Sequence, residues 1–276
     1  MISNFSDRVR LNNGTEMPWL GFGVFKVQDG AEVEQAVGCA LENGYRSIDT
    51  AAVYNNETGV GKAINNSGIP RDQIFLTTKV WNNDLRMERT REAFAESLDR
   101  LQTDYVDLYL IHWPVKEFYH KAWHVLEELY AGGRIRAIGV SNFMVHHLKD
   151  LLGIADVIPA INQIEFHPWL IQPELQDFCR EHGIQTEAWS PLAQAKLLSE
   201  PVITTIANKH DKTPAQIILR WDLQHQVVTI PKSITPERIA ENAHIFDFEL
   251  SQEDMRCIDS LDSGKRIGAD PDNFSF

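Results

Sequence analysis

The chain has 276 residues, of which 43% are hydrophobic and 24% are charged, so it can bury the core of a globular protein. Its formal net charge is −13 and no basic run exceeds two residues, which argues against nucleic acid and anionic membrane surfaces as partners. The N-terminus lacks an apolar signal segment, and no apolar run approaches the ~20 residues of a membrane helix. A reducing, cytoplasmic location is expected from the three scattered cysteines, Cys39, Cys179 and Cys257.

The first predicted element is a β-hairpin over residues 8–18. It is centred on Asn13-Gly14, a dipeptide that tolerates the positive φ of a tight turn. After this hairpin, eight short apolar runs typical of strands alternate with helix-like segments. The predicted strands are residues 19–25, 46–49, 74–79, 106–111, 137–141, 160–165, 185–190 and 227–231.

Local signals place several helices between and after these strands. Apolar residues at helical spacing predict a helix over 87–101. Thr213 is followed by proline and, at the third position, by glutamine, a capping box that predicts a helix start. Ser251 begins a similar signal near the C-terminus, and residues 200–210 form a further helix-like piece.

Eight strands that alternate with helices predict parallel β-α units closed into one (β/α)8 barrel, the TIM-barrel form of the α/β class. We expect a single domain over residues 1–276, with the hairpin and the extra helices as additions to the barrel. An open doubly wound sheet is the alternative, but that fold usually carries Gly-x-Gly-x-x-Gly after its first strand. Residues 21–26 read Gly-Phe-Gly-Val-Phe-Lys and lack the third glycine.

Four polar residues fall where predicted strands end, the edge at which barrel enzymes carry reactive groups: Asp49, Tyr54, Lys79 and His112. Free tyrosine has a pKa of ~10, and a neighbouring ammonium can lower that pKa by ~1–3 units. Lys79 would thus make Tyr54 a usable acid, and Asp49 would hold Lys79 charged. His112 would donate a hydrogen bond to a carbonyl oxygen. These four residue types together predict the reduction of a carbonyl group, with a nicotinamide cofactor as the hydride source.

Structural roles remain open for these residues. Asp49 and Lys79 could form an ion pair that only joins two strand ends, because structural networks also hold such groups. His112 follows an apolar strand, where a histidine is often a satisfied member of the core.

Other motifs carry weaker signals. Residues 59–62 resemble the end of a phosphate-binding loop but lack its earlier glycine and its final serine or threonine. His120 and His124 have zinc-motif spacing, but Lys121 stands in place of the glutamate. The pair at 146–147 is expected at the surface, and no metal site is predicted.

Several longer segments together resemble the aldo-keto reductase family, in the family's order and over nearly the whole chain. They are GFGVFK (21–26), GYRSIDTAAVYNNE (44–57), TTKVW (77–81), DLYLIHWP (107–114), GRIRAIGVSNF (133–143), NQIEFHP (162–168), EAWSPL (187–192) and IPKS with PERIAEN (230–242). The resemblance implies the barrel, dependence on NADPH, and a catalytic tetrad made of the four strand-end residues.

The resemblance also implies a cofactor site along the rim of the barrel. Ser141, Asn142 and Gln163 would bind the nicotinamide carboxamide, and Trp189 would stack on the ring unless it is plain barrel packing. The full set of implied cofactor contacts is Gly21, Phe22, Asp49, Ser141, Asn142, Gln163, Trp189, Ser190, Leu192, Lys232, Ser233, Arg238, Glu241 and Asn242.

Within this set, Lys232, Ser233 and Arg238 would bind the 2′-phosphate of NADPH. Two cations and a hydroxyl within seven residues can neutralise a dianionic phosphate, although the two cations could also be a solvated surface. Ser190 and Leu192 would line the pyrophosphate. The adenine would face Glu241 and Asn242. Thr235 departs from a position that is often basic in the family, which bears on the strength of the NADPH preference.

An aromatic pocket is expected to receive the substrate, lined by Trp19, Phe25, Tyr54, Trp81, His112 and Trp113. The short tail, residues 264–276, suggests an open site for small aldehydes. Within the family, the chain most resembles bacterial glyoxal and methylglyoxal reductases, so NADPH-dependent reduction of reactive aldehydes and dicarbonyls, and hence carbonyl detoxification, is expected of a monomer. The alternatives are a ketone reductase of the 2,5-diketo-gluconate type and a nucleotide-binding redox sensor with little turnover.

Overall fold

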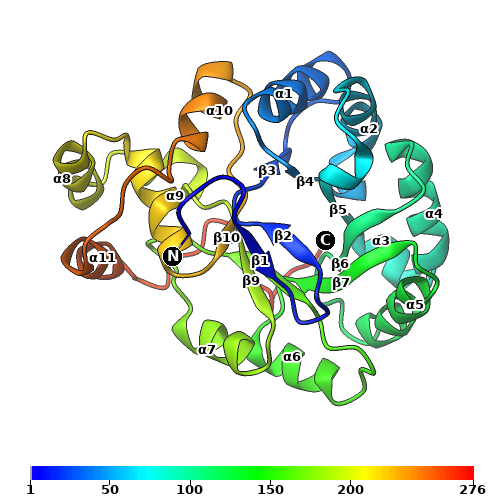
Figure 1. The fold of residues 1–276 in the computed structure, drawn as a ribbon. Coiled ribbons are helices and arrows are strands. Elements are labelled where there is room, and N and C mark those ends of the chain that lie inside the picture. Colours follow the sequence, from blue (N-terminus) through cyan, green and yellow to red (C-terminus); the bar gives the residue numbers. More distant parts are fainter. Residues whose placement is uncertain (1) are drawn as a thin grey trace.

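A computed structural model describes residues 2–276, and it begins with the predicted hairpin. Strands β1 (Arg8–Arg10) and β2 (Glu16–Pro18) pair antiparallel, with Arg8 opposite Pro18. Gly14 lies in the turn with φ 88°, a conformation that favours glycine. Figure 1 looks along the molecule, with this hairpin crossing the near end of a ring of strands and helices.

Eight parallel strands form the predicted (β/α)8 barrel, in the order β10-β9-β8-β7-β6-β5-β4-β3. Between β10 and β3 the barrel closes through a parallel bridge of Leu20 with Thr229, and Gly21 N–H donates to Thr229 O over 2.9 Å. The strands are β3 (Phe22–Gly23), β4 (Ser47–Asp49), β5 (Phe75–Val80), β6 (Val106–Ile111), β7 (Ile135–Ser141), β8 (Ile161–Glu165), β9 (Gln185–Trp189) and β10 (Val228–Thr229).

The two strands at the closure are shorter than the predicted runs 19–25 and 227–231. Only two residues of each form regular strand, because Pro231 has no N–H with which to continue the ladder. Pro231 still accepts a hydrogen bond from Gly23 N–H over 3.0 Å. The barrel therefore closes between β10 and β3 through only a few backbone hydrogen bonds.

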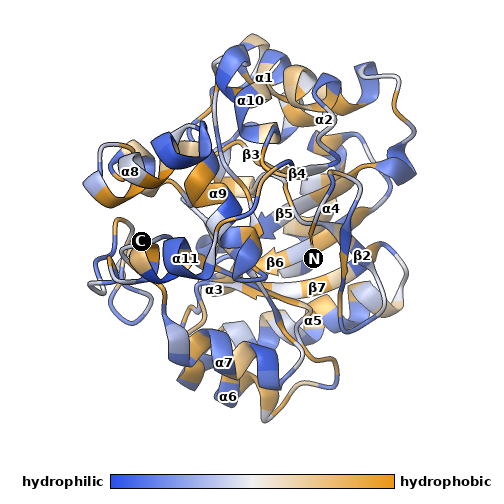
Figure 2. Ribbon diagram, turned by 60° about the vertical axis from the view of Figure 1, so that its left-hand side comes forward, coloured by the Kyte–Doolittle hydropathy of each residue, from blue (hydrophilic) through white to orange (hydrophobic). Residues whose placement is uncertain are grey.

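Helices surround the strands, and their hydrophilic residues (blue in Figure 2) lie largely on the outward sides. The predicted caps are confirmed: Thr213 and Ser251 each accept a hydrogen bond from the third residue of the helix that follows. The helices are α1 (Ala31–Glu42), α2 (Glu57–Asn66), α3 (Asn82–Arg86), α4 (Thr90–Leu101), α5 (Tyr119–Ala131), α6 (Val145–Leu152), α7 (Pro173–Glu181), α8 (Pro201–His210), α9 (Pro214–Gln224), α10 (Pro236–Ala243) and α11 (Gln252–Asp259), with 3₁₀ turns η1 (Ala52–Tyr54), η2 (Arg71–Gln73) and η3 (Ala193–Ala195).

The helix predicted over 87–101 begins later, at Thr90. Residues 82–86 form the separate helix α3, and Glu88 between the two helices has φ 54°, outside the right-handed helical region. The break lets α3 stand at the end of β5, beside the rim of the barrel.

Two glycines that suggested a phosphate loop are packing residues of α2. A Cβ at Gly59 would lie 2.3 Å from Val33 Cγ1 of α1, and a Cβ at Gly61 would lie 2.3 Å from Leu101 O of α4. Helix α2 therefore approaches both neighbours closely only because these positions have no side chain.

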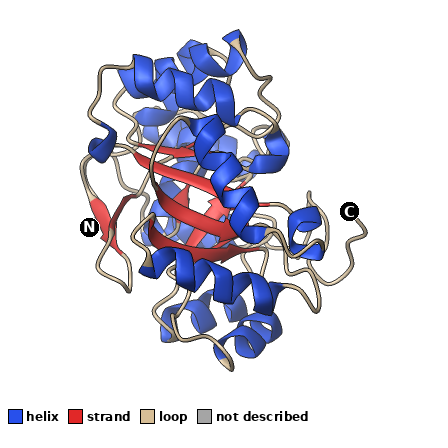
Figure 3. Cartoon of the chain, turned by 90° about the vertical axis from the view of Figure 1, so that its right-hand side faces the viewer, coloured by secondary structure: helices blue, strands red, loops and turns tan. Residues whose placement is uncertain are grey.

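The two ends of the barrel differ. The hairpin covers the end where the strands begin, and the C-terminus lies at the other end (Figure 3). Trp19 packs at the hairpin end, in a cluster with Leu11 and Met17. Its predicted place at the pocket mouth is therefore wrong, because Trp19 precedes β3 while the mouth lies where the strands end. No helix within residues 2–276 is both long enough and apolar enough to span a membrane.

Candidate active site

The four predicted strand-end residues lie together at the end of the barrel opposite the hairpin. Lys79 Nζ donates to Asp49 Oδ1 over 2.6 Å and to Thr50 O over 2.9 Å, and both ions are buried. The same Nζ lies 5.2 Å from the centroid of the Tyr54 ring. The rings of Tyr54 and His112 meet edge to face, with centroids 5.7 Å apart. A buried ion pair, a buried imidazole and a partly buried phenol thus share one corner of this end of the barrel.

Lys79 is charged and His112 is neutral in this corner. Burial alone would lower the pKa of Lys79, but Asp49 and Tyr54 outweigh it and raise that pKa above the ordinary value. The pKa of His112 is far below its ordinary value, because the ring is buried and because Lys79 is nearby. At neutral pH the lysine is therefore an ammonium, and the histidine is a neutral imidazole with one N–H to donate.

Tyr54 differs from the prediction in its net pKa. Burial raises the pKa of the phenol, Lys79 lowers it, and Asp49 raises it further, so the net pKa lies above the ordinary value. Lysine acts in the predicted direction, but burial outweighs it. Tyr54 is therefore a protonated phenol at neutral pH, as a proton donor must be.

The residues implied for the nicotinamide carboxamide form one hydrogen-bonded group beside this corner. Trp189 Nε1 donates to Asn142 Oδ1 over 2.9 Å, and Asn142 Nδ2 donates to His112 O over 3.0 Å. Ser141 Oγ donates to Gln163 O over 2.9 Å. Asn142 has φ 65°, a left-handed conformation that is uncommon outside glycine and that turns the chain sharply after β7.

A further acid, which sequence reasoning missed, belongs to this group. Gln163 Nε2 donates to Asp49 Oδ2 and to Glu187 Oε2, each over 2.8 Å. Glu187 is fully buried in β9. An acid at the centre of a predicted strand, residues 185–190, was the available signal, because an acid buried in a sheet needs a buried partner.

The remaining implied cofactor residues fall into two sets. The cations Lys232 and Arg238 are exposed, whereas Ser233 is buried and accepts from Thr235 N–H over 3.1 Å. Glu241 accepts from Thr213 Oγ1 over 2.8 Å. Asn242 is also buried, Leu192 is partly buried, and Ser190 has φ 50°.

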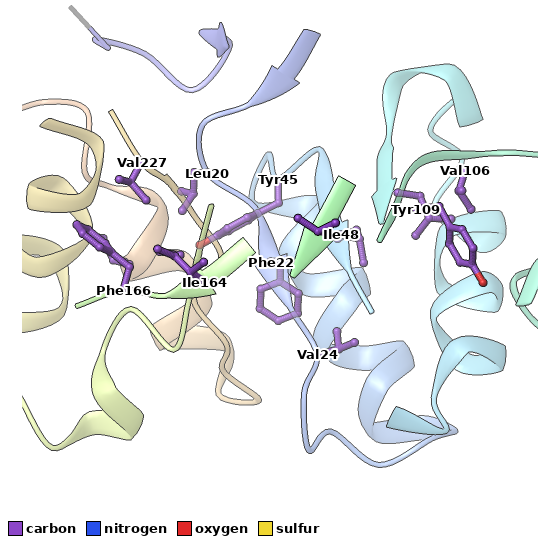
Figure 4. Packing of buried hydrophobic residues seen from close by; sticks show 14 of the residues in the cluster. Leu20, Phe22, Val24, Tyr45, Ile48, Val106, Tyr109, Ile164, Phe166 and Val227 are labelled. Carbon is purple, nitrogen blue, oxygen red and sulfur yellow. The ribbon is translucent and has the colours of Figure 1, made fainter. Parts of the chain in front are cut away.

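Gly21 and Phe22 are placed differently, in the barrel itself. The Gly21 N–H is used in the closure, and the Phe22 ring packs edge to face on Tyr45 with centroids 5.7 Å apart (Figure 4). Both residues are buried and pack in the barrel, and their contact with the cofactor stays a prediction.

An aromatic wall borders Tyr54 and His112. Phe25 is 48% exposed and its ring centroid lies 5.0 Å from that of Tyr54. The chain end packs on the opposite part of the wall: Phe276 stacks on Trp81 at 5.7 Å, and Phe274 lies 5.1 Å from Trp113. The short tail therefore lies against the aromatic wall and does not leave it open as expected, although Phe274 is only partly buried and Phe276 is 44% exposed.

Further contacts hold this tail across the rim. Glu165 accepts hydrogen bonds from the backbone N–H groups of residues 267–268. Asp272 Oδ1 lies 2.9 Å from His146 Nε2 and 3.5 Å from His147 Nε2, so the predicted surface histidines contact the tail. His147 Nδ1 already accepts from the Met144 N–H over 3.2 Å. Both nitrogens of that ring are thus engaged by protein groups.

Comparisons with known proteins agree with this geometry. A profile of the aldo/keto reductase family matches residues 19–263. The chain is 59% identical over 276 residues to glyoxal reductase of Bacillus subtilis (strain 168), with 100% of both chains covered. It is 50% identical over 270 residues to methylglyoxal reductase DkgA of Escherichia coli (strain K12), covering 96% of this chain and 97% of that one.

Solved structures show the same fold. An aldo/keto reductase from Brucella melitensis is 52% identical with a TM-score of 0.90, covering 93% of this chain and 99% of that one. A variant of Gox0644 in complex with NADPH is 41% identical with a TM-score of 0.93, covering 98% and 99%.

Proposed function

This chain belongs to the aldo/keto reductase family, and we propose that it reduces glyoxal, methylglyoxal and similar small aldehydes to alcohols with NADPH. It is an oxidoreductase that uses a nicotinamide cofactor. When bound, reduced nicotinamide supplies the hydride. The observation that carries the proposal is the buried Asp49–Lys79 pair beside a protonated Tyr54 and a neutral His112, at the barrel end where reactive groups gather.

In the proposed mechanism, Tyr54 gives its proton to the carbonyl oxygen. The phenolate that remains faces the Lys79 ammonium, which stabilises the new negative charge. Asp49 keeps that ammonium charged and in place. The neutral His112 donates a hydrogen bond to the same oxygen, which orients the carbonyl and stabilises developing charge. A matched general acid contributes about 10²–10⁴ in rate.

The residues around Trp189 fit a carboxamide. Both hydrogens of Gln163 Nε2 are donated to carboxyl groups, which leaves Gln163 Oε1 as an acceptor for the carboxamide N–H₂. Ser141 Oγ and Asn142 Oδ1 each accept one bond already and retain a second lone pair. The exposed Lys232 and Arg238 would bind the 2′-phosphate, and this favours NADPH over NADH.

The aromatic wall and the tail that lies against it favour small substrates. Phe274 and Phe276 cover Trp113 and Trp81, so a bulky aldehyde would have to displace the tail. The names of the two reductase relatives support dicarbonyls such as glyoxal and methylglyoxal. The cytoplasmic location, the monomeric state and the single domain stay predictions.

The test follows NADPH absorbance with methylglyoxal, glyoxal, a nitrobenzaldehyde and 2,5-diketo-gluconate. Among these carbonyls, we expect the small aldehydes to be reduced with the highest kcat/KM.

Tyr54→Phe should lower kcat by about 10²-fold or more while NADPH affinity is retained, because only the proton donor is lost. Tyr105→Phe is the matched control. It also removes one phenol hydroxyl, from a residue that directly precedes β6 and contacts Arg136, and it should leave kcat unchanged. Tight NADPH binding without turnover of any carbonyl would favour a redox sensor instead.

A further inference from the structure

A second carboxyl group lies beside the Asp49–Lys79 pair, and the proposed mechanism does not use it. Glu187 is 0% exposed, and it stands opposite Gln163 in the register of β8 and β9. Gln163 Nε2 reaches Glu187 Oε2 and Asp49 Oδ2, each over 2.8 Å. One amide group therefore joins two acids that come from β4 and β9.

The charges of this group do not balance if both acids are ionised. The two hydrogens of one amide nitrogen point about 120° apart, which places the two acceptor oxygens about 5 Å from each other. Two carboxylates at that separation, without water, cannot both ionise easily. The nearby cation, Lys79, is already bonded to Asp49 Oδ1 over 2.6 Å. Within residues 2–276, Glu187 Oε1 has no hydrogen-bond partner.

The surroundings of Glu187 agree with a neutral acid. Burial, and then Asp49, raises the pKa of the Glu187 carboxyl to about 8, although Gln163 and Lys79 act in the opposite direction. The facing groups are Asp49 from β4, Lys79 from β5, Gln163 from β8 and the Tyr54 phenol from η1. Glu187 therefore carries a proton at neutral pH and loses it in mildly alkaline solution.

We propose that Glu187 is a positioning residue of the reductase site: in its protonated form it holds the Gln163 amide, and through that amide it orients Asp49 and the Gln163 Oε1 acceptor. This inference rests on the proposed function. When Glu187 is ionised, a second negative charge stands near Tyr54 and opposes the phenolate that forms as the proton leaves. Reduction should therefore slow as Glu187 loses its proton.

The kinetic test uses Glu187→Gln, which has the same shape and cannot ionise. The measured quantity is kcat/KM for a slow aldehyde with NADPH between pH 6 and pH 10. In the unmodified protein we expect kcat/KM to fall about tenfold from pH 7 to pH 9, as one deprotonation near pH 8 requires. In the variant this ratio should be below about twofold. An equally steep fall in the variant would overturn the proposal.

Asp222→Asn is the matched control. Asp222 is also fully buried, and burial also raises its pKa well above the ordinary value, but its partner is Thr229 Oγ1 and not a residue of the site. This control should keep the tenfold fall. If it also lost the fall, a general effect of buried acids would explain the result and the proposal would fail.

A measurement without turnover separates this inference from the proposed function. The nucleotide-free protein, carrying glutamate labelled with ¹³C at the side-chain carboxyl, is titrated by NMR. One glutamate signal should titrate near pH 8 and be absent from Glu187→Gln. If no glutamate of the unmodified protein titrates between pH 7 and pH 9, the proposal is overturned even if Glu187→Gln does not fold. Failure to reduce any carbonyl would instead count against the proposed function.

Discussion

Lys79 is a fully buried cation, and its surroundings explain why it stays charged. Removing an ammonium from water costs several kcal/mol, and a close anion with additional hydrogen bonds must offset that cost. Asp49 Oδ1 at 2.6 Å and Thr50 O at 2.9 Å provide both. The second oxygen of Asp49 accepts from Gln163. Each polar atom of the pair thus has a fixed partner, which holds the ammonium next to Tyr54.

A substitution of Arg238 tests whether the protein prefers NADPH over NADH. Arg238→Ala should weaken NADPH binding about 10- to 100-fold, because hydrogen bonds to a charged phosphate contribute about 1.5–3 kcal/mol. NADH lacks that phosphate, so its Kd should change less than about twofold. Arg91→Ala, another exposed arginine but on α4, is the control and should change neither Kd. Equal losses for both nucleotides would place the phosphate elsewhere. Titration calorimetry or nucleotide fluorescence gives the Kd values.

At the scale of elements, α2 is fixed between α1 and α4 by its glycines and by a buried acid. Glu57 at the start of α2 accepts from Thr78 Oγ1 of β5 over 2.5 Å and from Arg100 Nε of α4 over 2.7 Å. These contacts set the position of the loop that precedes α2, and Tyr54 stands on that loop. Helix packing on the outside of the barrel thus holds the segment that directly follows Tyr54.

Two glycine substitutions test this packing. Gly61→Ala should lower the free energy of unfolding by about 1–3 kcal/mol, because its Cβ would lie 2.3 Å from Leu101 O. Gly38→Ala is the matched control in α1, where nothing lies within 4 Å of the added Cβ. It should raise the free energy of unfolding by about 0.4–1 kcal/mol, because glycine is a poor helix residue. Denaturant unfolding measures both, and similar effects at the two positions would contradict the close approach.

The tail is the element that we expect to limit the size of the substrate. Phe276→Ala removes the ring stacked on Trp81, so kcat/KM for bulky aromatic aldehydes should rise roughly tenfold relative to methylglyoxal. Ile158→Ala, an exposed apolar residue just before β8, is the control and should leave that ratio unchanged. A ratio that Phe276→Ala does not alter would mean that the tail leaves the entrance free. A panel of aldehydes of graded size gives the ratio.

For the whole molecule, the buried acids predict how stability depends on pH. The pKa of Glu187 is about 8 in the folded chain and near 4.5 when unfolded, so only the folded chain holds this proton between those values. The stability that this proton contributes is fully present below about pH 4.5 and is lost as pH rises to about 8. The pKa of Asp222 is also raised, and it acts in the same direction.

The contribution of Glu187 is measurable as the difference in free energy of unfolding between the unmodified protein and Glu187→Gln. From pH 5 to pH 8, the free energy of unfolding of the unmodified protein should fall relative to that of Glu187→Gln, by up to about 1.4 kcal/mol per pH unit. Denaturant unfolding at several pH values gives both curves, and their difference cancels the other titrating groups. Parallel curves would mean that Glu187 is ionised in the folded protein.

The sequence by itself determined the order of most elements and which residue types meet at the candidate site. Apolar runs and helical spacing, together with the caps at Thr213 and Ser251, depend on neighbours within a few residues, so they could be predicted locally. Asp49 and Lys79 could be placed at one end of the barrel because parallel strands present their ends together. That rule explains why a contact between residues 30 positions apart was foreseen.

Only the tertiary structure decided which residues distant in sequence come into contact. Trp19 lies at the hairpin end, Phe276 returns to Trp81, and Gln163 joins Asp49 to Glu187. These partners are distant in sequence, and their contacts depend on how the barrel closes and on which way each side chain points. Burial likewise reversed the predicted net shift of the Tyr54 pKa. The physical reason is common to all of them: desolvation and packing depend on every surrounding element at once.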